Sequence, residues 1–156
     1  MVETRRERLT GATAHLDRGG RPVVTNPDGT TIDIATAGSG PGLTPLDLLY
    51  SSLAACLVIS ARIAASELQL LARLDAVTAR VTGDKADGAP TRIGAIRSEL
   101  SIAGDLGEAE RDAIVRRAEE ICTVSNTLRG GANVSAGDLI SRRPGYACRR
   151  RRGADC

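Results

Sequence analysis

Between Leu46 and Leu71 the sequence is dominated by alanine, serine and aliphatic residues, with Cys56 in the middle. A helix start is visible: Thr44 suits the N-cap, Pro45 suits the first helical position, and Asp47 stands three residues after the cap, as in a capping box. One face of the expected helix has the 3.6-residue period and carries Leu46, Leu49, Leu53, Cys56 and Ile63. Further alanines and aliphatic residues widen this face nearly all round, which predicts a buried central helix.

The same segment bears on the cellular compartment. Four serines together with Arg62 and Glu67 interrupt its apolar run, so it is too polar for a membrane span. The first ten residues, MVETRRERLT, are charged and lack the apolar core of a secretory signal. We therefore expect a cytoplasmic protein without a membrane partner.

The segments on either side of the central helix predict an α+β fold. The expected strands are residues 12–16, 21–25, 31–37, 74–85, 91–104 and 132–137. The second expected helix is 106–122, with Ala109, Ile114, Ala118 and Ile121 facing inward, and 123–131 is expected to be a loop. Because the strands come in antiparallel runs and do not alternate with helices, the class is α+β.

An arginine-rich segment closes the chain. Residues 141–156 hold six arginines and one aspartate, a net charge of +5, so the rest of the chain carries −3 of the total +2. We predict one domain, residues 1–140, followed by a disordered tail, 141–156. Such a tail could touch nucleic acid, but the chain has no Phe or Trp on which bases could stack. No nucleic-acid partner is expected beyond this tail.

Thiols are the reactive groups that remain after the common catalytic devices are excluded. No phosphate-binding loop is present, and His15, the single histidine, is expected to be structural. The cysteines, Cys56, Cys122, Cys148 and Cys156, include no C-x-x-C pair, so a zinc site is poorly supported. The sequence therefore favours chemistry carried by cysteine, without a metal.

Two of these cysteines stand where peroxide reduction by a thiol pair would need them. Cys56 lies on the rigid central helix, and Cys122 lies where the second helix ends and a Ser/Asn/Gly-rich segment begins. One thiol can be oxidised to a sulfenic acid, and the second can condense with it to a disulfide. A thiolate at Cys56 needs a lowered pKa, which an arginine from elsewhere in the fold could provide. Two unrelated buried cysteines are the alternative.

Two motifs resemble those of one known family. TPLDLLYSSLAACL (44–57) resembles the helix start of the OsmC/Ohr family of organic hydroperoxide reductases, in which an N/T/S-P-x-[ED]-L-L opening leads to A-A-C. CTVSNTLRGG (122–131) resembles the second cysteine motif of that family, C-P-x-S-N or C-P-[VI]-x-x-T-L. The resemblance covers about residues 10–138. It implies antiparallel sheets wrapped around two long helices, and an intertwined homodimer with both sites at the subunit interface.

The resemblance also implies roles for individual residues. Cys56 matches the peroxidatic cysteine and Cys122 the resolving cysteine. Arg18 best matches the arginine that the family places in the first hairpin, and Arg21 is its neighbouring competitor. Asp47 stands where other OsmC-like branches have an acidic residue, so it either orients the arginine or serves only as the cap.

The activity implied is that of a cysteine-based thiol peroxidase in oxidative stress defence. Organic hydroperoxides are the expected substrates, with hydrogen peroxide as a further candidate. The resemblance implies an external dithiol reductant, of a lipoyl or other small type, and no bound cofactor. The alternative is a non-catalytic OsmC-like module for binding or redox sensing. It is favoured by Leu46 in place of the usual glutamate, by Thr123 in place of the usual proline, and by the scarcity of aromatic residues.

Overall fold

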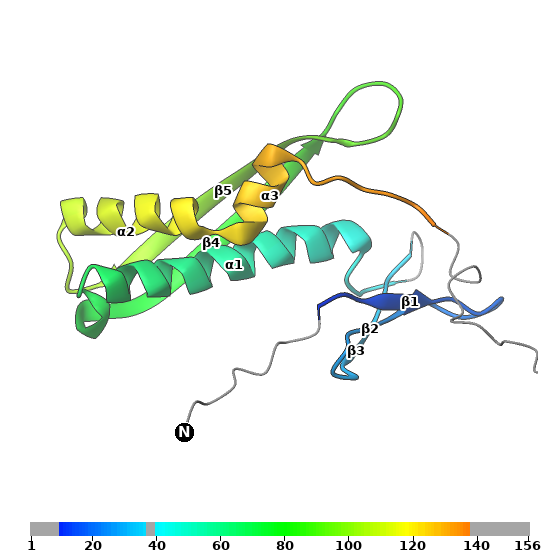
Figure 1. Cartoon of the computed structure of the whole chain (residues 1–156), viewed down its shortest axis with the longest axis horizontal. Helices are drawn as coiled ribbons and strands as arrows, with labels where there is room; N and C mark the ends of the chain where they lie inside the picture. Colours follow the sequence, from blue (N-terminus) through cyan, green and yellow to red (C-terminus); the bar gives the residue numbers. More distant parts are fainter. Residues whose placement is uncertain (1–9, 37–39, 138–156) are drawn as a thin grey trace, which may run out of the picture.

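A computed structural model describes residues 10–36 and 40–137 of the chain. Three short strands, β1 (Thr13–His15), β2 (Val23–Thr25) and β3 (Thr31–Asp33), come first. The long helix α1 (Pro45–Glu67) and a 3-10 turn, η1 (Leu71–Arg73), follow, and then two long strands, β4 (Leu74–Lys85) and β5 (Ile93–Gly104). Two helices, α2 (Glu108–Ile121) and α3 (Thr123–Gly130), complete the described part (Figure 1). The predicted α+β class is confirmed.

The strands form two separate antiparallel sheets. β1, β2 and β3 make a small sheet in that order, and β4 pairs with β5 along a hairpin from Leu74↔Gly104 to Lys85↔Ile93. In Figure 1 the small sheet lies beyond the N-terminal end of α1, while β4 and β5 run alongside α1 and α2. The long hairpin therefore carries the packed body of the fold.

The start of α1 agrees with the prediction from the sequence. The Thr44 hydroxyl accepts from the Asp47 N–H at 3.2 Å, and the Asp47 carboxylate accepts from the Thr44 N–H at 2.9 Å, with Pro45 in the first turn. These bonds pair two main-chain N–H groups that a helix start leaves without partners. The capping box therefore fixes where α1 begins.

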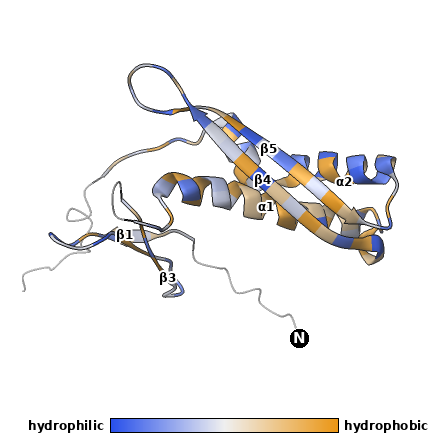
Figure 2. Cartoon of the chain, turned by 180° about the vertical axis from the view of Figure 1, so that it is seen from behind, coloured by the Kyte–Doolittle hydropathy of each residue, from blue (hydrophilic) through white to orange (hydrophobic). Residues whose placement is uncertain are grey.

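The core lies between α1, β5 and α2. Its main cluster consists of small and branched side chains: Ala61, Ala64, Ala65, Ile102, Leu106, Ile114 and Ala118. The three alanines of α1 let α2 approach closely, so the core needs no aromatic residue. Figure 2 shows the alternation of polar and apolar residues along β4 and β5 that turns one face of the hairpin toward this core.

Within one chain α1 is only half covered, which corrects the predicted buried face. Its buried residues are Leu53, Leu57, Ser60, Ala61, Ala64 and Ala65. Leu46 is 40% exposed, Ile63 46% and Ile59 60%, because β4, α2 and α3 pack on one side of the helix. On α2, Ile114 and Ala118 are buried as predicted, Ile121 is half-buried, and Ala109 is exposed.

Two other predictions for the C-terminal part are wrong. Residues 123–131 were expected to form a loop, but Thr123–Gly130 is the helix α3. Residues 132–137 form no strand, and Val134 is 94% exposed. Within the described residues this segment pairs with no strand of either sheet. The arginine-rich tail, with Cys148 and Cys156, lies outside the described residues.

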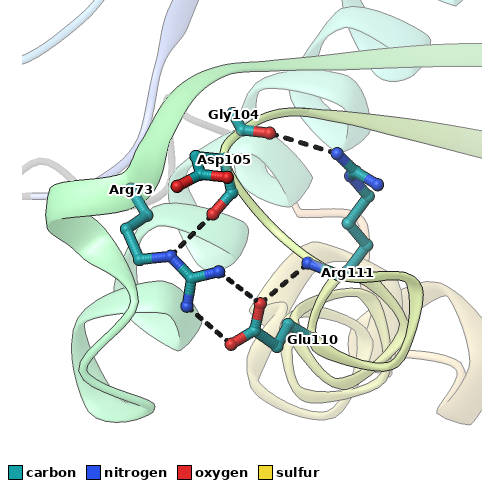
Figure 3. A network of polar contacts seen from close by, with 6 residues as sticks. Arg73, Gly104, Asp105, Glu110 and Arg111 are labelled. Atoms are coloured by element: carbon teal, nitrogen blue, oxygen red, sulfur yellow. Dashed lines mark hydrogen bonds and ion pairs between the residues drawn. The ribbon is translucent and has the colours of Figure 1, made fainter.

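A polar network joins the elements at the end of α2 remote from Cys122. The Arg73 guanidinium donates to both Glu110 carboxylate oxygens at 2.7 and 2.8 Å, and to the Asp105 carbonyl at 2.6 Å (Figure 3). Glu110 also accepts from the Gly107 N–H at 2.8 Å, and Arg111 donates to the Gly104 carbonyl at 3.1 Å. Gly104 has φ +143° and lies against the Arg73 carbonyl, so only glycine fits there. This network fixes how β4, β5 and α2 meet.

Candidate active site

Cys56 and Cys122 lie against each other at the junction of α1 and α3. Cys56 sits in the middle of α1 and is half-buried, whereas Cys122, between α2 and α3, is completely buried. Both belong to a cluster with Leu53 and Leu57, and both are free thiols. The structure thus brings together two residues that are 66 positions apart in the sequence.

The first turn of α3 is directed at Cys56. Cys122 is the N-cap of α3, and its sulfur accepts from the Ser125 N–H at 3.4 Å. The main-chain N–H groups of Thr123 and Val124, in the same turn, act to lower the pKa of Cys56. Helix N-termini carry unpaired N–H groups and partial positive charge, so they favour a thiolate.

These contacts set the protonation of Cys56. Burial by itself would raise the pKa of the Cys56 thiol, but hydrogen bonds outweigh burial and hold this pKa below that of an ordinary cysteine. The donors, in order of their effect, are the Val124 N–H, the Cys122 thiol, the Ser60 hydroxyl and the Thr123 N–H. Cys56 is therefore the thiol of the pair that ionises first.

Cys122 is affected in the opposite direction. Burial raises the pKa of Cys122, and the neighbouring Cys56 raises it further, both by hydrogen bonding and by charge repulsion. Hydrogen bonds from the Ser125 and Val124 N–H groups act against this rise. As the pH rises, Cys56 therefore loses its proton before Cys122 does.

The first hairpin is not brought to the thiols within one chain. Arg18 lies in the exposed turn between β1 and β2, and Arg21 is exposed just before β2. Neither arginine is among the groups that shift the Cys56 pKa. In Figure 1 this sheet lies past the N-terminal end of α1. For Arg18 or Arg21 to contact Cys56, the first hairpin would have to come from a second copy of the chain.

Asp47 and His15 make local contacts. The Asp47 carboxylate accepts from the N–H and the hydroxyl of Thr44, the latter at 2.7 Å, and these bonds hold its pKa below the usual range. His15 faces Asp17 at 3.0 Å on an exposed strand, so it forms no pair with either cysteine. Among the described residues, no group of three or more His, Cys, Asp or Glu side chains could hold a metal ion.

A cavity of about 360 Å³ adjoins the cysteine pair. Its lining comes from α1, β5 and α3: Leu49, Leu53, Ile93, Gly94, Ala95, Ile96, Ser98, Ser125, Leu128 and Arg129. Neither cysteine lines it, but Leu53 is three residues before Cys56 on α1, and Ser125 is three residues after Cys122. Each of these two lining residues thus lies about one helical turn along the chain from a cysteine.

The contribution of α3 to the candidate site was not predicted from the sequence, because residues 123–131 were expected to form a loop. A signal for the helix was present: Gly130 is its last residue, and Gly131, with φ +68°, follows at the C-terminal end. Glycine at that place is typical of a helix end. Ser60, one turn after Cys56 on α1, was considered only as one of the polar residues that interrupt the apolar run.

Comparison with known proteins identifies the family. A family model described as "OsmC-like protein" matches residues 38–136. The chain therefore belongs to the OsmC-like family, and the predicted membership is confirmed. No curated protein sequence matches the chain.

Solved structures show the same fold. An organic hydroperoxide resistance protein OsmC from Legionella pneumophila is 25% identical, with a TM-score of 0.64, over 80% of this chain and 93% of that one. OhrB of Bacillus subtilis, an organic hydroperoxide resistance protein, is 24% identical, with a TM-score of 0.60, over 80% and 94%. An OsmC-like protein from Mycoplasma pneumoniae is 21% identical, with a TM-score of 0.67, over 80% and 90%.

The family and the fold also decide whether α1 is a membrane span or a core helix. By length and composition alone α1 could cross a membrane, with 23 residues and a mean hydropathy of 1.8 over its most apolar window. It packs instead against β4, α2 and α3. It is therefore the core helix of an OsmC-like domain, although the prediction from the sequence had rated it too polar to qualify as a span.

Proposed function

We propose that this protein is a cysteine-based peroxidase that reduces organic hydroperoxides, with Cys56 as the peroxidatic and Cys122 as the resolving residue. The observation that carries the proposal is the packing of Cys56 against Cys122, and the opposite directions of their pKa shifts support it. Peroxide reduction needs a thiolate first and a thiol second, in that order. The proposed setting is the cytoplasm, and the proposed role is defence against oxidative stress.

The first step consumes the peroxide. The Cys56 thiolate attacks the distal oxygen of the hydroperoxide, the O–O bond breaks, and the leaving oxygen takes up a proton and departs as an alcohol. Cys56 is then a sulfenic acid. Before the reaction the thiolate is held by the Val124 and Thr123 N–H groups and by the Ser60 hydroxyl.

The second step follows from how the two thiols affect each other. The thiolate of Cys56 is one cause of the high pKa of Cys122. Oxidation of Cys56 removes that negative charge, so the pKa of Cys122 falls, and the Ser125 N–H is in place to stabilise its thiolate. The Cys122 sulfur then attacks the Cys56 sulfur, a disulfide forms, and water leaves. An external dithiol, of lipoyl or similar type, restores both thiols by two exchanges; no resident cofactor is required.

A homodimer would complete the site. The strands of the small sheet are three residues long, and the sheet lies away from the core. A sheet of this size needs to pack against another element to be stable. An apolar hollow of about 800 Å³ lies between this sheet and the start of α1, and Ile59 and Ile63 are uncovered farther along the helix. A second copy would cover these surfaces, and its first hairpin would bring Arg18 or Arg21 to Cys56. Asp47 would serve by fixing the start of α1.

Peroxide consumption tests this proposal. The full chain is supplied with cumene hydroperoxide and dihydrolipoamide, and Cys56→Ser and Cys122→Ser are compared with wild type. We expect Cys56→Ser to lose turnover, and Cys122→Ser to retain one round of peroxide reduction without efficient recycling. Turnover by Cys56→Ser at the wild-type rate would overturn the assignment.

The second candidate function is a redox-sensing module without turnover, and the exchange of the family proline for Thr123 is the observation that favours it. Such a module would form the Cys56–Cys122 disulfide with peroxide but would not be reduced by dihydrolipoamide. Repeated peroxide additions with the reductant present separate the two functions: an enzyme consumes each addition, whereas a sensor consumes only the first.

A further inference from the structure

Cys122 has a structural task in addition to its thiol. It is the N-cap of α3, and its sulfur accepts from the Ser125 N–H at 3.4 Å. Its carbonyl accepts from the Asn126 N–H at 3.0 Å. A helix start leaves its first N–H groups without main-chain partners, so an N-cap side chain helps to keep the helix formed. The first turn of α3 therefore depends on where the Cys122 sulfur lies.

The other contacts of α3 hold it loosely. The helix has eight residues, a length at which a helix is marginal by itself. Val124 is half-buried and Ser125 is buried, whereas the other residues of the helix are exposed. The Asn126 side chain donates to the Glu120 carbonyl at 2.9 Å, but the ion pair of Arg129 with α2 spans 3.8 Å, which is too long for a hydrogen bond. We therefore expect loss of the cap to loosen α3.

The cap and a disulfide make different demands on the same sulfur atom. As a cap, the Cys122 sulfur must stay over the Ser125 N–H of its own helix. In a disulfide, its position is fixed by the torsions of a bond to the sulfur of Cys56, which lies on α1. A neutral sulfur is also a weak acceptor, so it forms this hydrogen bond only where the geometry allows. Bond formation with Cys56 is therefore expected to remove the cap from α3.

We propose that Cys122 makes α3 a redox switch: the helix is closed while Cys122 caps it, and it is released when Cys122 joins Cys56 in a disulfide. The step is a condensation in which the Cys122 sulfur bonds to the Cys56 sulfenic acid, and the hydroxyl leaves with the Cys122 proton as water. Cys122 is completely buried in the reduced form. Release of α3 opens the disulfide to the external dithiol, and reduction restores the cap. The place of this switch in a catalytic cycle rests on the proposed peroxidase function.

Amide hydrogen exchange tests the switch without any peroxide. The full chain carries Cys148→Ser and Cys156→Ser, so that Cys56 and Cys122 are its only thiols. Diamide takes one hydrogen from each thiol and leaves the disulfide, and exchange is followed by mass spectrometry on peptides from α3 and β4. We expect the α3 amides to exchange about fivefold faster in the disulfide form, with those of β4 within twofold of the reduced form.

Two variants at position 122 separate the cap from the disulfide. Without oxidant, Cys122→Ala should exchange in α3 about as fast as the disulfide form, because alanine provides no cap. Cys122→Ser should stay protected with and without diamide, because serine is a good N-cap and forms no disulfide. Equal exchange of Cys122→Ala and Cys122→Ser would show that the cap does not hold α3 and would overturn the proposal.

The redox pair of the same chain gives the decisive comparison. Equal protection of α3 in the reduced and disulfide forms, equally faster exchange in β4, or no disulfide with diamide would each overturn the switch. A chain that releases α3 with diamide but consumes no cumene hydroperoxide would refute the peroxidase function and leave the switch standing. Peroxide turnover with α3 equally protected in both forms would refute the switch alone.

Discussion

Cys122, the N-cap of α3, packs against Cys56 in the middle of α1. Cys56 gains nothing from the ends of its own helix, because it lies near the centre of α1. The helix N-terminus that lies at Cys56 is that of α3, and its N-cap is the second thiol, Cys122. One short helix thus begins at Cys122 and favours the thiolate of Cys56.

Alkylation at different pH values should show the opposite shifts of the two thiols. Because the Cys56 pKa is lowered, its labelling by iodoacetamide should reach half its maximum at a pH below that of an ordinary cysteine. The raised pKa of Cys122 should place its labelling above that pH. Peptide mapping separates these sites from Cys148 and Cys156. Equal labelling profiles for Cys56 and Cys122 would contradict the assignment of roles.

Thr123→Pro should weaken the thiolate of Cys56 without disturbing α3. Proline is well suited to the first helical position but has no N–H, so one donor to Cys56 is lost. We expect the Cys56 pKa to rise and the alkylation rate at neutral pH to fall severalfold. Thr123→Ser, which keeps the N–H, is the matched control. An unchanged pKa in Thr123→Pro would show that the Thr123 N–H does not act on the sulfur.

Ile59→Glu should break the proposed dimer. Ile59 is 60% exposed on α1 within one chain, and a second copy would bury it. A carboxylate buried without a partner is costly, so we expect the mass from light scattering to fall to that of one chain. Arg116→Glu, an exposed position on α2, should leave the mass unchanged. A wild-type mass equal to one chain would refute the dimer directly.

Arg73→Ala should separate stability from activity. It removes the paired bonds to Glu110 and the bond to the Asp105 carbonyl, at the end of α2 remote from Cys122 (Figure 3). We expect a lower Tm with kcat/KM for cumene hydroperoxide within about twofold of wild type at 25 °C. Arg97→Ala, which removes an exposed pair with Asp84, should change neither quantity. A large loss of activity in Arg73→Ala below its Tm would mean that this end of the fold is coupled to the site.

The local signals in the sequence were sufficient for the start of α1 and for the long strands. Thr44, Pro45 and Asp47 predicted the beginning of α1, because a capping box depends only on residues close in the chain. The same holds for β4 and β5, whose alternation and intervening turn are local. The pairing of Cys56 with Cys122 was expected from the family resemblance, because no local rule joins them.

What sequence reasoning missed depends on tertiary placement. The donors from Thr123 and Val124 are main-chain groups, so side-chain identity gives no sign of them. The predicted burial of α1 was based on composition, but Ile59 and Ile63 lie on the side of the helix that β4, α2 and α3 do not cover. The residue pattern at 132–137 likewise could not show whether a strand there would have a neighbour to pair with.

The central claim is tested most directly by the product of one equivalent of peroxide. The reduced full chain is treated with cumene hydroperoxide, alkylated under denaturing conditions, digested and analysed by mass spectrometry. The account predicts a loss of two mass units per chain and a crosslinked peptide pair that contains Cys56 and Cys122. Recovery of Cys56 as an unreacted, alkylated thiol while the peroxide persists would contradict it.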